Sequence, residues 1–306
     1  MPAGTPAVHS AVEYLLMPEL PEVETVVRGL RRHLPGRRIV ELRLGKTDFI
    51  DDPAAIGERV PGSLIRAVRR HGKFLVLELE RDGEGHAEEL LVVHLGMTGQ
   101  LIVVAADAEI APHTHAFFTL DDQRELRFRD PRRFGRMLVA APADGEKILG
   151  PLGADPLEVS AADFQRLISS RRARIKALLL DQHVFRGMGN IYTDESLWKA
   201  KIHPARLGAN LKAEEIARLQ KAMRAILEEA IRLGGSSISD YVGADGQPGE
   251  FQIRHRAYGR EGKKCFRCGA KIRRMIVAGR SSYFCPACQK APRGRRVRPS
   301  RSRAKN

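Results

Sequence analysis

Met17-Pro18-Glu19-Leu20-Pro21-Glu22-Val23-Glu24 is the stretch from which both the fold and the chemistry of this chain can be worked out. Inside a chain, a proline nitrogen is an amide without a proton. At the start of a chain it is a secondary amine, and an α-amino group titrates near about pH 8, so that much of it is neutral at physiological pH. Such an amine can attack carbon and form an iminium ion. Whether Pro18 starts the chain therefore decides what chemistry this stretch can perform.

The same stretch begins a predicted helix. Its apolar residues recur three or four positions apart from Leu20 to Leu34, and Pro35-Gly36 would end it. From there to about residue 140, short apolar runs alternate with turn residues, which is typical of a β-sandwich or barrel. The predicted strands cover residues 39–44, 64–68, 74–79, 90–94, 101–104, 116–120, 125–128 and 136–139.

The second half of the chain has a different pattern. Gly150-Pro151-Leu152-Gly153 indicates a linker, and the polar, glycine-containing segment Ser236–Phe251 is predicted to be a mobile loop. Between and beside them the spacing predicts helices over residues 161–169, 173–181, 193–200 and 213–233. The sequence thus predicts an α+β chain, with a helix and a β-sandwich followed by a helical domain.

The positive charge of the chain is concentrated at one end. The 306 residues carry a net charge of +15, yet the last 44 hold 15 Lys and Arg and no acidic residue, leaving 37 basic and 37 acidic residues in the first 262. A basic segment of this kind favours a polyanion such as nucleic acid. No apolar run reaches the length of a membrane span, and residues 1–16 contain no Lys or Arg, so we expect a cytoplasmic protein without a membrane partner.

All four cysteines lie in this basic segment. Cys265-x-x-Cys268 and Cys285-x-x-Cys288 are separated by sixteen residues, a spacing that suits one structural zinc ion held by four thiolates. Disulfides are the alternative, but a cytoplasmic setting disfavours them. Residues 271–277 and 281–284 are predicted to form two short strands, and a turn at Gly279-Arg280 would project Arg280 outward.

These motifs, taken in order, resemble the formamidopyrimidine-DNA glycosylase family of base-excision repair enzymes. The resemblance runs from residue 17 to residue 289. It rests on the opening stretch and on five further motifs: Gly72-Lys73-Phe74-Leu75, His94-Leu95-Gly96-Met97-Thr98-Gly99, Asp130-Pro131-Arg132-Arg133-Phe134-Gly135, Gly189-Asn190-Ile191-Tyr192 and Gly279-Arg280.

The resemblance implies a bifunctional DNA glycosylase and abasic-site lyase that removes oxidised purines from duplex DNA. Pro18 would form the Schiff base with the flipped-out nucleotide, and Glu19 would act as general acid. Lys73 and Arg280 would assist base loss and elimination while holding phosphate. The matched DNA contacts are His113, Arg132, Arg171, Lys176 and Asn190, with Met97, Arg132 and Phe134 as the wedge that fills the gap left by the everted base. The loop over 236–251 matches the one that covers the everted lesion in the family.

The implied organisation is an extension over 1–16, a catalytic β-sandwich domain over 17–145, a helix–two-turn–helix DNA-binding domain over 146–250, a zinc β-hairpin finger over 251–289 and a basic tail over 290–306. We expect a monomer that acts on bacterial nucleoid DNA. The sequence departs from the family at Phe185-Arg186, where small apolar residues are usual, and also in the residues before Met17. We expect Met17 to be the true start of the protein.

Two other functions stay open at this point. One is an oxidised-pyrimidine glycosylase of the related endonuclease VIII type. The other is a protein that binds damaged DNA without cutting it, which would follow if Pro18 remained an amide.

Overall fold

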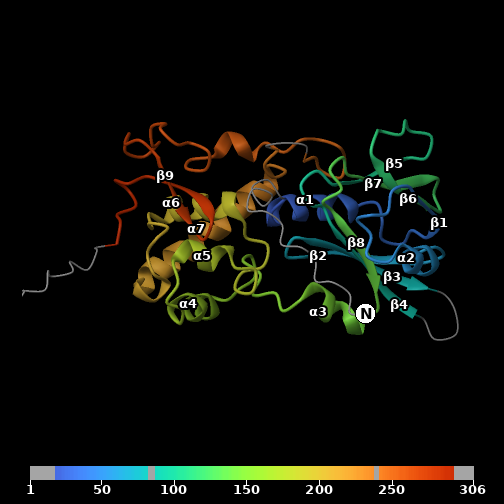
Figure 1. Ribbon diagram of the computed structural model, residues 1–306, viewed down its shortest axis with the longest axis horizontal. Helices are drawn as coiled ribbons and strands as arrows, with labels where there is room; N and C mark the ends of the chain where they lie inside the picture. Colours follow the sequence, from blue (N-terminus) through green and yellow to red (C-terminus); the bar gives the residue numbers. More distant parts are fainter. Residues whose placement is uncertain (1–17, 82–86, 238–240, 293–306) are drawn as a thin grey trace, which may run out of the picture.

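The computed structural model describes residues 18–81, 87–237 and 241–292. The expected extension over residues 1–16 and most of the expected tail over 290–306 lie outside these ranges. Figure 1 shows two lobes side by side, with the strands in one and most of the helices, together with the C-terminal hairpin, in the other.

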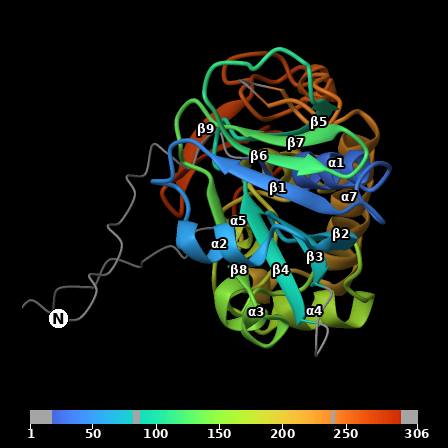
Figure 2. The ribbon, with the colours of Figure 1, turned by 90° about the vertical axis from the view of Figure 1, so that its right-hand side faces the viewer.

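Two four-stranded antiparallel sheets form the first lobe, and Figure 2 shows them as two layers. One sheet has the order β2-β3-β4-β8 and the other the order β1-β6-β7-β5. The strands are β1 (Ile39–Leu44), β2 (Leu64–His71), β3 (Phe74–Arg81), β4 (Ala87–His94), β5 (Gln100–Ala105), β6 (Thr114–Leu120), β7 (Arg124–Arg129) and β8 (Arg136–Ala140). The eight strands confirm the predicted sandwich, and several run a few residues further than expected because ladder pairing continues past their apolar cores.

Helix α1 (Leu20–Leu30) packs against the core of this lobe. Its first turn is fixed by the Glu22 carboxylate, whose Oε2 accepts a hydrogen bond from the backbone N–H of Glu19 at 2.9 Å. The helix ends at Leu30 rather than at Leu34, because the chain tightens into turns with bonds such as His33 N to Leu30 O at 3.0 Å. Leu34 nevertheless stays buried in the core, as its apolar spacing predicts.

The second lobe is helical and packs around its own apolar cluster. Its elements are α4 (Ala161–Ser169), α5 (Ile175–Leu180), α6 (Asn190–Ala200), η2 (Gly208–Asn210), α7 (Ala213–Arg232) and η3 (Phe251–Arg254), and β9 (Arg273–Val277) and β10 (Arg280–Phe284) form the hairpin after them. Two short helices in the first lobe were not predicted, α2 (Pro53–Arg59) and α3 (Pro142–Leu149).

The lobes are joined by a buried ion-pair network. The Arg70 guanidinium, on β2 and 6% exposed, donates to Glu24 of α1 at 2.9 Å and to Asp155, just after the linker, at 2.8 Å. Arg186, which departs from the usual family pattern, belongs to the same junction, because it donates to the Gly153 carbonyl at 3.1 Å and lies 3.6 Å from Asp155. Its guanidinium thus binds the linker.

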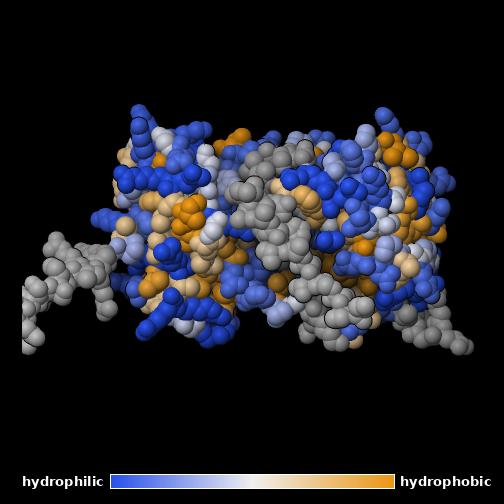
Figure 3. Space-filling view, viewed as in Figure 1, coloured by the Kyte–Doolittle hydropathy of each residue, from blue (hydrophilic) through white to orange (hydrophobic). Residues whose placement is uncertain are grey.

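Hydrophilic residues cover most of the face drawn in Figure 3, and the apolar residues on it form small separate patches. Among the residues that the structure describes, no helix is both long enough and apolar enough to span a bilayer.

Candidate active site and DNA-binding surface

Glu19 lies where the two lobes meet. Its buried carboxylate accepts hydrogen bonds from the backbone N–H groups of Ile191 at 2.9 Å and Tyr192 at 3.3 Å, in the first turn of α6. These N–H groups have no partner within the helix, and the positive end of the helix dipole favours an anion there. Gly189 makes this approach possible, because a Cβ at that position would lie 2.1 Å from the Glu19 Cδ.

Burial shifts the ionisation of this carboxyl. Desolvation raises the pKa of Glu19 to about 7, against the opposing positive charge of Lys73. Desolvation also lowers the pKa of Lys73, with the Glu19 charge acting the other way. Glu19 therefore carries its proton on a sizeable share of molecules at neutral pH, as a general acid requires.

A cavity of about 350 Å³ opens beside Glu19 and brings the predicted catalytic residues together. Lys73 reaches it from the turn between β2 and β3, Asn190 from the start of α6, and Arg280 from the start of β10. The other lining residues are Phe74, His94, Leu149, Leu152, Leu180, Gln182, Met188 and Gly189. Pro18 is buried and directly precedes Glu19, so its nitrogen belongs to the same corner of the molecule.

Arg280 is placed differently from the sequence expectation. It is the first residue of β10 and half-buried, and the turn of the hairpin is formed by Ala278 and Gly279, both with positive φ. The expectation of an arginine projecting outward from the turn was wrong, because strand pairing already begins with Arg280 opposite Val277. The strand directs its side chain to the cavity that Lys73 and Glu19 also line.

His94 is a lining residue that sequence reasoning did not single out, although its motif was recognised. Burial, followed by the charge of Lys73, lowers the pKa of His94 to about 4, so the imidazole is neutral at neutral pH. Its Nδ1 accepts a hydrogen bond from Gly96 N at 3.1 Å, and its ring lies 5.1 Å from that of Phe74.

Glu22 connects this site to the segment predicted as a mobile loop. Its Oε1 accepts a hydrogen bond from the Tyr192 hydroxyl and one from Ser236 N at 2.7 Å, and its main-chain oxygen accepts one from the Tyr241 hydroxyl at 3.0 Å. Tyr241 and Ala244 also pack into the apolar core of the first lobe. The described part of the loop is therefore bonded to α1 at several points.

The predicted wedge divides into exposed and buried members. Arg132 is exposed, and its guanidinium lies 4.5 Å from the centre of the half-buried Phe134 ring. Met97 is only 6% exposed, so its side chain lies mostly within the protein. His113 is exposed on the turn before β6, with φ at 68°. Arg171 is half-buried and donates to the Leu167 carbonyl at 3.0 Å near the end of α4.

Lys176 does not lie on the surface where it was expected to bind phosphate. Its ammonium group is fully buried and donates to Asp194 Oδ1 and to the Ser281 carbonyl, both at 2.7 Å. Asp194 accepts a further hydrogen bond, from Tyr283 N at 2.9 Å. The expectation was wrong because Asp194 of α6 and the carbonyl of Ser281 in the C-terminal hairpin surround the ammonium group, which leaves it inaccessible to a phosphate. Lys176 ties this hairpin to α5.

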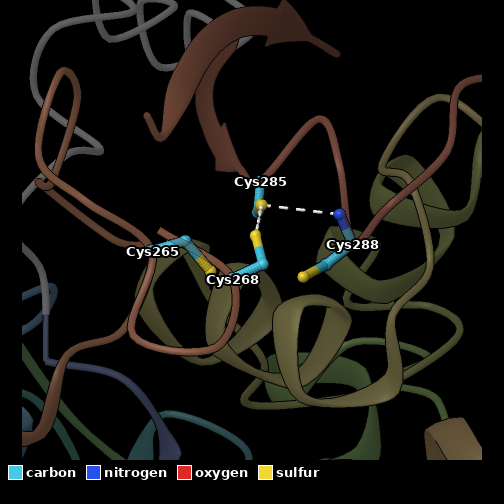
Figure 4. Close-up of side chains that lie close together, drawn as sticks. All are labelled: Cys265, Cys268, Cys285 and Cys288. Carbon is cyan, nitrogen blue, oxygen red and sulfur yellow. Dashed lines mark hydrogen bonds between the residues drawn. The ribbon is translucent and has the colours of Figure 1, made fainter. Parts of the chain in front are cut away.

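The four cysteines form a metal site. Their sulfur atoms all lie within 4.8 Å of one another, and Figure 4 shows the two pairs of the motif facing each other. Cys268 and Cys285 are 3.4 Å apart at sulfur, far beyond the length of a disulfide bond. Four thiolates at this distance suit one tetrahedral zinc ion with no open position, so the ion is structural. Trp198 of α6 donates from Nε1 to Cys265 Sγ at 3.4 Å, which anchors the site to the helical lobe.

Comparison with known proteins agrees with this geometry. The chain matches the family models for the formamidopyrimidine-DNA glycosylase N-terminal domain over residues 17–137, the H2TH domain of the same family over 152–242, and the zinc finger found in FPG and IleRS over 262–291. It is 45% identical over 278 residues to the formamidopyrimidine-DNA glycosylase of Herpetosiphon aurantiacus, covering 89% of this chain and 100% of that relative.

The chain belongs to the formamidopyrimidine-DNA glycosylase family.

Other relatives lead to the same family. The enzyme of Solibacter usitatus is 45% identical over 276 residues, covering 90% of this chain and all of that relative. A Lactococcus lactis FPG mutant in complex with DNA containing Fapy-dG aligns with a TM-score of 0.80 at 33% identity, covering 90% of this chain and all of that one. A complex of Lactococcus lactis Fpg with DNA containing an abasic site aligns with a TM-score of 0.79 at 33% identity, covering 89% of this chain and all of that one. Membership of the family confirms the fold class and the zinc finger expected from the sequence.

Proposed function

We propose that this chain is a base-excision repair enzyme that removes oxidised purines from duplex DNA and then cuts the strand at the abasic site. The observation that carries the proposal is the position of Glu19. Its carboxyl, with a pKa of about 7, follows Pro18 directly and lines one cavity with Lys73, Asn190 and Arg280. An amine next to a cavity that is lined by a proton donor and two cations supplies the groups that Schiff-base chemistry on a phosphodiester needs.

Each residue has a defined task. The Pro18 nitrogen uses its lone pair to bond the anomeric carbon, and the damaged base leaves with the electron pair of the glycosidic bond and takes up the proton that the nitrogen loses. Glu19 donates a proton to the ring oxygen as the sugar opens, leaving an iminium ion on Pro18. Loss of the 3′ phosphate and then of the 5′ phosphate follows by β- and δ-elimination, with Lys73 and Arg280 stabilising the phosphate charges.

The same proposal assigns the DNA-binding groups. His113, Arg132, Arg171 and Asn190 contact the duplex, and Met97 and Phe134 act with Arg132 as the wedge beside the everted base. Met97 must then leave its nearly buried position when DNA binds. The domain boundaries at residues 145, 250 and 289 divide these tasks between the β-sandwich, the helical domain and the finger.

This chemistry requires Pro18 to be a free amine, so we propose that the active form begins at Pro18, after removal of Met17. The family match begins at residue 17, which supports this proposal. We further propose that the enzyme works as a monomer on nucleoid DNA. We place it in the bacterial cytoplasm, since the relatives named above are bacterial proteins.

Borohydride trapping tests the proposal. Protein beginning at Pro18 should form a covalent adduct with a duplex that contains 8-oxoguanine, and the full chain should not. An adduct of equal yield from the full chain, or none from the short form, would contradict the assignment of Pro18. Parallel reactions with a thymine glycol duplex test the alternative substrate class. If the short form binds an abasic-analogue duplex but cleaves neither damaged duplex, the chain would instead be a non-catalytic damage-binding protein.

A further inference from the structure

Ser236, the first residue of the loop over 236–251, has an unusual set of polar contacts. It is 6% exposed, and its backbone N–H is bonded to Glu22, as described above. Its hydroxyl oxygen lies 3.4 Å from the Tyr192 hydroxyl and 3.2 Å from His255 Nε2. His255 comes from the end of η3, nineteen residues later, so this contact closes the loop across its base.

The number of protons on each of these groups decides which one donates and which one accepts in each hydrogen bond. The Tyr192 hydroxyl has one proton and donates it to Glu22 Oε1, so toward Ser236 its oxygen can act only as acceptor. The Ser236 hydroxyl then donates to Tyr192 and accepts from His255, which fixes the imidazole as the Nε2–H tautomer. The result is a chain of hydrogen bonds from His255 to Ser236, Tyr192 and Glu22.

The other contacts of His255 hold its ring in place. The ring packs edge-on against Phe251 and Tyr258, each with ring centres 5.6 Å apart. Burial, followed by the charge of Arg260, lowers the pKa of His255 to about 4. The imidazole is therefore neutral at neutral pH and has a single N–H, as the chain of hydrogen bonds requires.

We propose that His255 is a positioning residue that holds the Ser236 hydroxyl, and with it the start of the loop over 236–251, in the arrangement that recognises the damaged base. The inference rests on the proposed function, because the loop is the segment expected to cover the everted lesion. An abasic site presents no base to the loop. His255 should therefore contribute to the affinity for a damaged base and leave the affinity for an abasic site unchanged.

Binding by the full chain tests this role, because Pro18 is an amide there and the lesion is not turned over. Dissociation constants are measured by fluorescence anisotropy for three duplexes of one sequence, containing 8-oxoguanine, a tetrahydrofuran abasic analogue or no damage. His255→Phe keeps a ring between Phe251 and Tyr258 but removes the hydrogen bond. We expect it to weaken 8-oxoguanine binding by about three- to tenfold, the range of one neutral hydrogen bond. Binding of the abasic analogue should stay within about twofold.

His255→Gln is the rescue variant, because its amide nitrogen can donate at the place of Nε2, and it should restore lesion binding to within about twofold. Ile253→Ala is the matched control, since Ile253 lies in η3 as well but is 73% exposed. Ser236→Ala removes the acceptor and should give the same selective loss, which keeps the test open if the phenylalanine variant does not fold.

Equal weakening on the lesion and the abasic analogue, no change on either, or failure of His255→Gln to restore binding would overturn the role of His255. A wild-type chain that does not distinguish the lesion from undamaged duplex would instead overturn the proposed function itself.

Discussion

The carboxyl group of Glu19 closes over the α-carbon of Gly189, so that a Cβ on Gly189 would lie 2.1 Å from the Glu19 Cδ. No flexible end of a side chain can absorb so short a contact, because the Glu19 carboxylate is also fixed by the N–H groups of Ile191 and Tyr192. The hydrogen bonds from Glu19 to α6 and the position of the proposed general acid therefore depend on the same glycine.

Gly189→Ala should displace Glu19 and lower the single-turnover rate of base release by about 100-fold, the usual cost of misplacing a catalytic group by about an ångström. Gly57→Ala is the control, because Gly57 lies in α2 and a Cβ there meets no atom within 4 Å. Rapid-quench assays on an 8-oxoguanine duplex measure both. A Gly189→Ala rate close to that of the wild type would contradict the proposed role of Glu19.

The raised pKa of Glu19 predicts the pH dependence of base release. Glu19 holds its proton below about pH 7, while the Pro18 amine becomes neutral toward about pH 8. The rate should therefore pass through a maximum between these values and fall on the alkaline side. The Glu19→Gln variant should release the base much more slowly, and its rate should no longer fall at alkaline pH. If the rate of this variant still falls at alkaline pH, a group other than Glu19 is the proton donor.

The same shift makes a prediction about stability. Because the pKa of Glu19 is higher in the folded state than its ordinary value of 4.5, the folded protein binds more protons between about pH 4.5 and 7, and its stability falls as the pH rises through this range. Glu19→Gln should gain stability relative to the wild type between pH 5 and pH 8, by on the order of 1–3 kcal/mol in urea unfolding. A difference that is constant with pH would contradict the raised pKa.

The buried pair of Lys176 and Asp194 should be costly to break from one side. Lys176→Met leaves a carboxylate without its partner and should lower the free energy of unfolding by about 3–5 kcal/mol at pH 8. The double variant with Asp194→Asn keeps an acceptor for Tyr283 N and should recover much of the loss. Urea unfolding of the two single variants and the double variant measures the coupling. Additive losses would mean that the pair does not act as a unit.

Removal of zinc should be visible through Trp198, the single tryptophan of the chain. Its indole N–H donates to Cys265 Sγ, and the Arg267 guanidinium lies 4.2 Å from its ring centre. Treatment with a strong chelator should shift the emission to longer wavelength as the ring becomes hydrated, and should weaken DNA binding because β10 carries Arg280. Added zinc should reverse both changes. Loss of metal without a change in emission would contradict this coupling.

Those parts of the fold that depend on local patterns were predictable from the sequence. The apolar alternation marked all eight strands of the sandwich, and the apolar spacing over residues 161–169 marked α4. Helix α2 was missed because a single residue of it, Ile56, is buried, although Asp52 caps it. The start of α6 at Asn190 was also missed, since its capping carboxylate comes from Glu19, more than 170 residues away in the chain.

The candidate site shows the same limit. The motifs named Pro18, Glu19, Lys73, Asn190 and Arg280, and the structure places four of them at one cavity with Pro18 next to it. Whether a basic residue is exposed cannot be found from its neighbours in sequence. The burial of Lys176 depends on an acidic residue eighteen positions later and on a carbonyl of the C-terminal hairpin.

The bridge that Arg70 makes between Glu24 and Asp155 has a consequence for binding. A charge buried at 6% exposure and held from both lobes cannot lose either partner without a large desolvation penalty. The relative position of the two lobes is thus already fixed at this junction before any ligand arrives. The protein therefore loses little conformational entropy when it binds DNA. More of the favourable free energy of its phosphate contacts can then offset the cost of bending the duplex and of turning a base out of its stack.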